Sequence, residues 1–100
     1  MPFDYVFPRS FTPTSIREHA PTSSGVYGIS NAREWIYIGE SDNIQESLLF
    51  HLGDMDTSLL KRQPTGFVFE VCDRAKRPSR QDRLILEYEP ACNRDASQHP

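Results

Sequence analysis

The stretch 25–39, GVYGISNAREWIYIG, decides the fold of this chain. Its two halves, GVYGIS at 25–30 and EWIYIG at 34–39, are rich in the β-branched and aromatic residues that favour strands. The three residues between them, NAR at 31–33, are typical of a turn. The sequence therefore predicts a β-hairpin at this place.

A helix is expected directly after the hairpin. Ser41, Asp42 or Asn43 can cap its start, and Gly53 is a typical residue just past a helix end. The apolar residues in between recur at helical spacing, and they are Ile44, Leu48, Leu49 and Leu52. A helix from the 41–43 region to about Leu52 follows from these signals.

The second half of the chain predicts one more strand and one more helix. Residues 66–72, GFVFEVC, are apolar enough for a largely buried strand. The run SRQD at 79–82 has the form of a capping box, so a helix is expected from there to about Glu89, where Pro90 ends it. Residues 54–65 give no firm pattern, although a helical turn around 58–62 is one option.

The N-terminal residues 1–22 read as an irregular lead-in, which is rich in proline. A short helix over 13–19 is possible there, with Thr12 as its cap and Pro13 at its first position. The aromatic residues of this segment are expected to form either a docking surface or a lid over the body, and they are Phe3, Tyr5, Phe7 and Phe11. Residues 23–93 form the domain and 94–100 a polar tail.

The order is β-hairpin, helix, strand, helix. This order predicts an α/β fold with a small three-stranded antiparallel-type sheet flanked by helices. One hundred residues, of which 37% are apolar and 25% charged, are enough for a single globular domain.

The composition also bounds location and partners. No run of about 18 apolar residues is present, and the N-terminus lacks a signal-peptide pattern, so we expect a cytoplasmic protein without a membrane partner. Cys72 and Cys92 lie outside any CxxC pair. Two reduced cysteines are the favoured interpretation, and a disulfide or a metal site stays open.

Basic residues gather in one part of this chain, whose net charge is −3. The segment from Lys61 to Arg83 carries seven of the eleven, which makes it a candidate for nucleic-acid binding. Acidic residues are interspersed, so an ordinary solvated surface is the plainer explanation. The candidates are Lys61, Arg62, Arg74, Lys76, Arg77, Arg80 and Arg83.

The hairpin carries a known signature. Gly25-Val26-Tyr27, nine residues, then Tyr37-Ile38-Gly39 resembles the GIY…YIG pattern of the GIY-YIG nuclease superfamily. The helix start at 41–44, the histidine at 51 and the P-x-x-N run at 90–93 are similar to later parts of the same pattern. The resemblance covers residues 23–93 and implies the fold of that family and the hydrolysis of phosphodiesters.

The resemblance also implies roles for single positions. The first tyrosine acts as or assists the general base, the second positions groups, and the last asparagine supports the site. Tyr27, Tyr37, His51 and Asn93 retain these family positions. A helical arginine would stabilise the phosphate charge and a glutamate would hold a divalent metal, usually Mg²⁺. Those two positions hold Ser47 and Gln81 here.

Both replacements remove charge. Gln81 offers a neutral carbonyl oxygen to a hard cation that is usually held by carboxylates, and Ser47 cannot neutralise a phosphate. The sequence thus predicts a catalytically degenerate endonuclease-like domain that binds nucleic acid or protein. We assign no metal ligands and expect no cofactor. Whether the chain is an enzyme stays open, and the two losses of charge weigh against it.

Two alternatives remain open at this point. The first is an active Mg²⁺-dependent GIY-YIG endonuclease with a rearranged site, in which Arg80 or Arg83 replaces the missing arginine. Mg²⁺ would be needed only in that case. The second is a structural or regulatory scaffold, because fold does not settle function. Tyr27, Tyr37, His51 and Asn93 would then have only structural roles.

Overall fold

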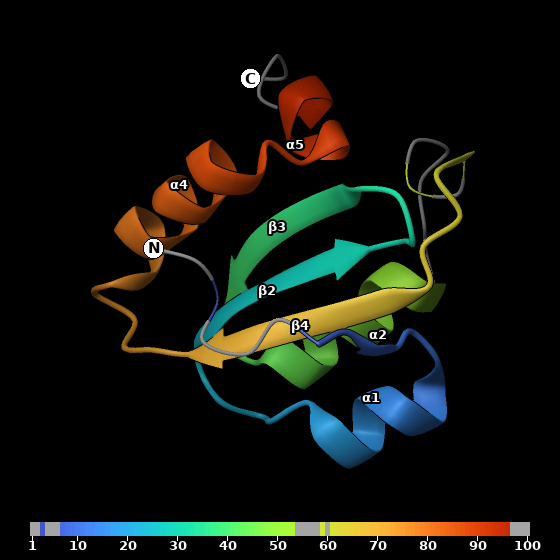
Figure 1. Cartoon of the computed structure of the whole chain (residues 1–100). Helices are drawn as coiled ribbons and strands as arrows, with labels where there is room; N and C mark the ends of the chain where they lie inside the picture. Colours follow the sequence, from blue (N-terminus) through green and yellow to red (C-terminus); the bar gives the residue numbers. More distant parts are fainter. Residues whose placement is uncertain (1–2, 4–6, 54–58, 60, 97–100) are drawn as a thin grey trace.

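Four antiparallel strands form the sheet at the centre of the molecule (Figure 1). The computed structural model describes residues 3, 7–53, 59 and 61–96. The strands lie in the order β1-β4-β2-β3, and their bounds are Arg9–Ser10 (β1), Gly25–Ser30 (β2), Trp35–Ser41 (β3) and Gly66–Val71 (β4). The predicted hairpin and the third strand are confirmed, but the prediction of a three-stranded sheet is wrong.

The unexpected strand is β1. It pairs with β4 through Arg9 opposite Phe67 and Ser10 opposite Gly66. Two residues are too few to show the alternation by which strands are recognised, and Pro8 and Pro13 on either side favour irregular structure. Only the neighbouring strand, far along the chain, makes this pair of residues a strand.

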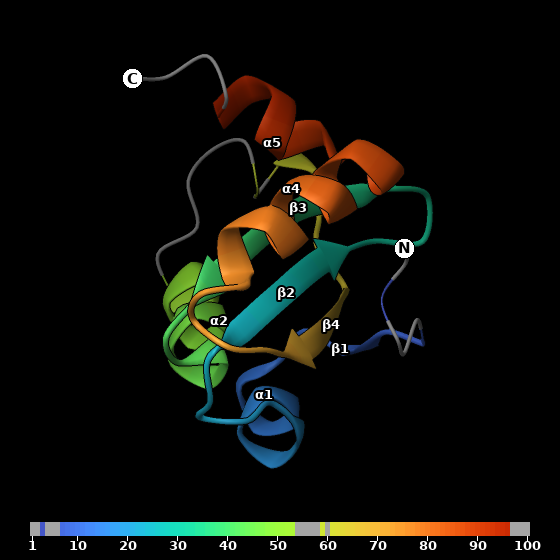
Figure 2. The ribbon, with the colours of Figure 1, turned by 90° about the vertical axis from the view of Figure 1, so that its left-hand side faces the viewer.

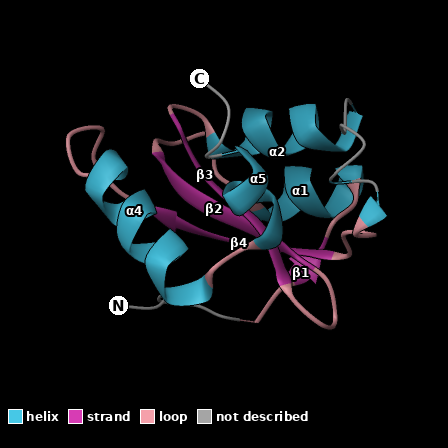
Figure 3. Ribbon diagram, turned by 90° about the horizontal axis from the view of Figure 1, so that it is seen from above, coloured by secondary structure: helices cyan, strands magenta, loops and turns pink. Residues whose placement is uncertain are grey.

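Helices cover both faces of the sheet. Their bounds are Pro13–His19 (α1), Ile44–Gly53 (α2), Arg77–Tyr88 (α4) and Ala91–Ala96 (α5). Helices α1 and α2 lie beside each other on one face (Figure 2), and α4 lies on the opposite face (Figure 3). Helix α5, which was not expected from the sequence, packs against β3.

The helix starts follow local chemistry. The Thr12 hydroxyl accepts from Ser15 N at 3.2 Å, as predicted for the cap of α1. Of the three candidates for α2, Asn43 is the cap, because its Oδ1 accepts from Glu46 N at 3.0 Å. The predicted capping box at 79–82 is wrong. Proline in the first turn favours an earlier start, so α4 begins at Arg77 and the Ser79 hydroxyl donates to Lys76 O inside the helix.

The apolar side chains form two clusters, one on each face of the sheet. The cluster under α1 and α2 includes Phe11, Ile16, Tyr27, Ile29, Ile36, Ile44, Leu48 and Phe67. The cluster under α4 includes Phe3, Val26, Ile38, Val68 and Leu84. Burial of these side chains on both faces supplies the main driving force for the fold.

The N-terminal aromatic residues divide between core and surface. Phe3 is buried, and its ring stacks on Trp35 at 5.7 Å and on Tyr88 at 5.8 Å. Phe11 is also buried, whereas Phe7 is 72% exposed. The lid interpretation therefore holds for Phe3 and Phe11. Tyr5 lies outside the described residues. Of the possible helical turn at 58–62, residues 59, 61 and 62 are described, and 59 and 61 are helical.

Neither Cys72 nor Cys92 forms a disulfide, which fits the favoured interpretation of the two cysteines as reduced thiols. Cys92 is buried. Cys72 is partly buried, and desolvation is the largest cause of the raised pKa of its thiol. No helix among the described residues has the length and apolar character needed to cross a membrane.

Removing the Phe3 ring tests whether the lead-in belongs to the core. We expect Phe3→Ala to lower the free energy of unfolding by about 3–5 kcal/mol, since a buried ring leaves a cavity. Phe7→Ala is the matched control and should change the free energy of unfolding by less than about 0.5 kcal/mol, since that ring is exposed. Urea unfolding measures both. Equal effects would contradict the lid.

Candidate functional site

The regular register of the hairpin places the two signature tyrosines on one face, because Tyr37 lies two residues from Gly39, the partner of Tyr27. Tyr27 lies opposite Gly39 and Ile29 opposite Tyr37, but the register then shifts so that Ser30 lies opposite Trp35. Ile36 is therefore an extra residue on β3, and both Ile36 and Tyr37 pack with the cluster under α1 and α2. The ring centroids of Tyr27 and Tyr37 are 6.2 Å apart.

Close packing of two tyrosines explains why the signature ends in a glycine, Gly39. A Cβ at this position would lie 2.7 Å from the Tyr27 hydroxyl and 2.8 Å from the Tyr37 ring. Both rings thus cover the backbone of β3 where a side chain would otherwise stand. The glycine is needed for close approach, and its backbone conformation is ordinary because no glycine among the described residues has positive φ.

His51 joins the tyrosines from the last turn of α2. The Tyr27 hydroxyl lies 2.8 Å from His51 Nε2, and the His51 ring is 5.2 Å from that of Tyr37. Tyr27 is only 3% exposed, and burial, followed by the nearby Tyr37, raises its pKa far above the usual range. Tyr27 therefore stays protonated at neutral pH, and the tautomer of His51 sets the direction of the hydrogen bond between the two groups.

Ser47 and Gln81, the two positions at which the resemblance expects an arginine and a glutamate, make neutral hydrogen bonds. Ser47 lies one helical turn before His51, and its hydroxyl is 2.5 Å from that of Ser41. The Gln81 amide on α4 donates a long bond of 3.4 Å to Ile38 O. Neither side chain carries a charge.

Asn93 fixes α5 to β3. Its Oδ1 accepts from Ile38 N at 2.6 Å, and its Nδ2 donates to Ile38 O at 2.9 Å. The side chain is buried, so these bonds are shielded from water. Gln81 and Asn93 thus meet at Ile38, which lies in the chain between Tyr37 and Gly39. These hydrogen bonds hold the backbone of β3 next to Tyr37.

The basic residues between Lys61 and Arg83 do not form one face. Four of them pair with carboxylates: Arg62 with Glu34, Arg74 and Arg77 with Asp42, and Arg80 with Glu70. Lys61 lines a hollow beside the hairpin turn together with Arg33, which the sequence did not single out. Lys76 and Arg83 line a second hollow on α4. The basic segment is thus divided among separate places.

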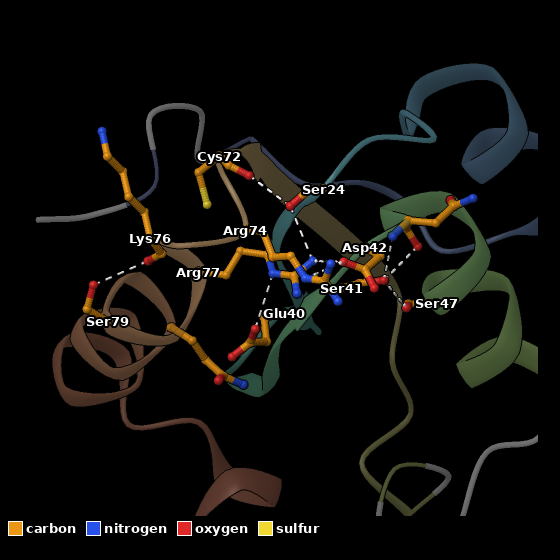
Figure 4. Close-up of polar contacts among 12 residues, drawn as sticks. Ser24, Glu40, Ser41, Asp42, Ser47, Cys72, Arg74, Lys76, Arg77 and Ser79 are labelled. Atoms are coloured by element: carbon orange, nitrogen blue, oxygen red, sulfur yellow. Dashed lines mark hydrogen bonds and ion pairs between the residues drawn. The ribbon is translucent and has the colours of Figure 1, made fainter.

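Arg80 does not replace the missing arginine. Its Nε and Nη2 donate to the two carboxylate oxygens of Glu70 at 2.6 and 2.7 Å, and both side chains are largely buried. A guanidinium held in this two-pronged way joins α4 to β4. Arg77, which is 8% exposed, is the arginine that lies against Asp42 and Glu40 near the start of α2 (Figure 4).

The arrangement of the sheet and helices matches solved structures. No known family profile matches the chain, and no curated protein matches it. The magnesium-bound GIY-YIG N-terminal endonuclease domain of UvrC from Thermotoga maritima superposes with a TM-score of 0.64 and 23% identity, over 75% of this chain and 91% of that one. A point mutant of that domain, bound to its catalytic divalent cation, gives 0.64 and 22% over the same shares.

The chain has the GIY-YIG fold. The resemblance seen in the sequence is thereby confirmed at the level of fold, including the antiparallel sheet flanked by helices.

The comparison corrects one expectation. We expected no cofactor, but the GIY-YIG domains of the same fold are bound to a catalytic divalent cation, which is magnesium in one of them. The residues of this chain fit such an ion poorly. Gln81 supplies an amide at the glutamate position, and no three His, Cys, Asp or Glu side chains gather among the residues described.

A methyl group at Gly39 tests the close approach of the two tyrosines. Gly39→Ala should lower the free energy of unfolding by about 1–3 kcal/mol, because both rings must move. Gly53→Ala is the control, since a Cβ there meets nothing within 4 Å, and it should raise the free energy of unfolding by up to about 1 kcal/mol. Urea unfolding compares them, and near-ultraviolet circular dichroism reports the rings.

Alkaline titration tests the burial of Tyr27. Its folded-state pKa is raised, so its contribution to stability is fully present below the unfolded value of about 10 and declines as pH rises above it. Unfolding of the wild type should therefore become easier with rising pH in this range. Tyr27→Phe should show a flatter dependence between about pH 9 and 11. Identical slopes for the two proteins would mean that Tyr27 ionises freely.

Proposed function

We propose that this domain is a GIY-YIG endonuclease-like module that binds nucleic acid and does not hydrolyse it efficiently. The observation that carries the proposal is that the side chains at positions 47 and 81 are uncharged. Ser47 and Gln81 stand where the family has its arginine and glutamate, and each makes a neutral hydrogen bond to its surroundings. Loss of one charge-stabilising group costs on the order of 10²–10³ in rate.

The retained groups support binding rather than chemistry. Tyr27 is buried and its pKa is raised, so it does not supply a tyrosinate at neutral pH. Its hydrogen bond to His51 holds β2 against α2 and keeps the surface of the site in shape. Nucleic acid is the favoured partner because the fold is shared with an endonuclease domain. Binding of phosphates should weaken steeply with salt.

An active Mg²⁺-dependent endonuclease with a rearranged site is the second candidate. The intact Tyr27–His51 contact at 2.8 Å favours it, as does the divalent cation in GIY-YIG domains of this fold. His51 would accept the proton of Tyr27, and the ion, when bound, would stabilise charge on the phosphate oxygens. This candidate requires charged groups other than those at positions 47 and 81.

Plasmid nicking separates the two candidates. Supercoiled plasmid is incubated with Mg²⁺ or Mn²⁺ and wild type, Tyr27→Phe, or the double variant Ser47→Arg plus Gln81→Glu. We expect no nicking by wild type above the Tyr27→Phe background and measurable nicking by the double variant, because it regains both charges. Adding Tyr27→Phe to the double variant should abolish that gain.

The contrary result is equally clear. Nicking by wild type that disappears in Tyr27→Phe would establish the second candidate. Fluorescence anisotropy with a labelled single-stranded oligonucleotide then tests the binding claim over a salt series. Affinity that falls with salt supports the proposal, and no binding at low salt would refute it and point to a protein partner.

A further inference from the structure

Two arginines converge on one exposed carboxylate oxygen beside the nuclease-like site. Arg77 Nη1 lies 2.6 Å and Arg74 Nε 3.6 Å from Oδ1 of Asp42 (Figure 4). The Asp42 side chain is 67% exposed, so this oxygen stands at the surface. Arg74 lies in the segment that leads into α4 and Arg77 is the first residue of α4, whereas Asp42 comes from the loop before α2.

Arg77 is firmly held on its inner side. Its side chain is 10% exposed, its Nη1 donates to Ser24 Oγ at 3.2 Å, and that hydroxyl donates to Cys72 O at 3.0 Å. Glu40 Oε1 lies 3.2 Å from Arg77 Nε. That contact lacks hydrogen-bond geometry, since Nε has no hydrogen-bond partner among the described residues, and it acts as a charge pair. The guanidinium is thus preorganised without Asp42.

The Asp42 carboxylate carries a negative charge at the point where a phosphate oxygen bound by the two arginines would lie. Guanidinium groups bind carboxylates and phosphates with the same geometry. If Asp42 turns away, Arg74 and Arg77 with Glu40 leave one net positive charge, which balances the single negative charge of a phosphodiester. The exchange needs no backbone movement, because an exposed aspartate side chain can rotate into water.

We propose that Arg74 and Arg77 form a phosphate-binding site for a nucleic-acid strand, in which Asp42 is the resident anion that the phosphate displaces. The inference rests on the proposed function and names the residues that would carry it.

The location links this site to the altered family position. Asp42 follows Ser41, whose hydroxyl contacts that of Ser47, the position at which the family has its arginine. In this chain a guanidinium reaches the loop before α2 from α4 instead of from α2. The domain thereby keeps a cation for phosphate although position 47 is neutral.

Charge-matched variants test the proposal. Asp42→Asn frees the two arginines and removes one negative charge, and Glu34→Gln does the same to Arg62 in an ion pair of 3.2 Å elsewhere. Anisotropy with a labelled single-stranded oligonucleotide should show binding that is about threefold to tenfold tighter for Asp42→Asn than for Glu34→Gln. Arg74→Ala, at a 79% exposed side chain, should weaken binding about as much. Equal affinities for Asp42→Asn and Glu34→Gln would overturn the site.

A second probe distinguishes this failure from that of the proposed function. Inorganic phosphate is titrated against the same variants, and binding is followed by NMR shifts of the arginine Nε–H groups. Phosphate binding that is tighter in Asp42→Asn, with no oligonucleotide binding by any variant, would keep the anion site and refute the nucleic-acid function. Salt-dependent oligonucleotide binding whose affinity is unchanged by Asp42→Asn and Arg74→Ala would support the nucleic-acid function and refute the phosphate site.

Discussion

The contact of Tyr27 across Gly39 is the constraint on which the rest of the site depends. It requires the β2–β3 register in which these two residues lie opposite each other, and it requires glycine at 39. With this register, Tyr37 lies two residues from Gly39 and therefore on the same face as Tyr27, and His51 joins the two rings from α2. A shift of one residue would turn Tyr27 to the α4 face.

Local patterns predicted much of the fold, and long-range contacts account for what they missed. The hairpin, α2 and β4 have strong periodicity and clear end signals within their own residues. Strand β1 exists only because β4 lies beside it, and α5 packs against β3, which is distant in the chain. The candidate site residues came from the resemblance, and the structure places Tyr27, Tyr37 and His51 in contact. The pairing of Arg77 with Asp42, 35 residues apart, has no signal in the sequence.

The distribution of charge distinguishes this domain from the pattern that its sequence resembles. At positions 47 and 81 a hydroxyl and an amide are satisfied by one hydrogen bond each, without any counter-charge. Ion pairs lie instead between α4 and the strands, at Arg80–Glu70, where both carboxylate oxygens accept hydrogen bonds, and at Arg77–Glu40, which is a charge pair. These pairs fix α4 over the sheet, so these charged residues contribute to the packing of the fold.

The hydrogen bonds of Asn93 also affect how two copies of the molecule meet. Strand β3 is the last strand of the sheet, and its outward N–H and C=O groups could pair with a strand of another chain. At Ile38 the amide of Asn93 occupies both groups as a neighbouring strand would. At this position Asn93 and helix α5 therefore cover the backbone groups through which a strand of another chain would pair.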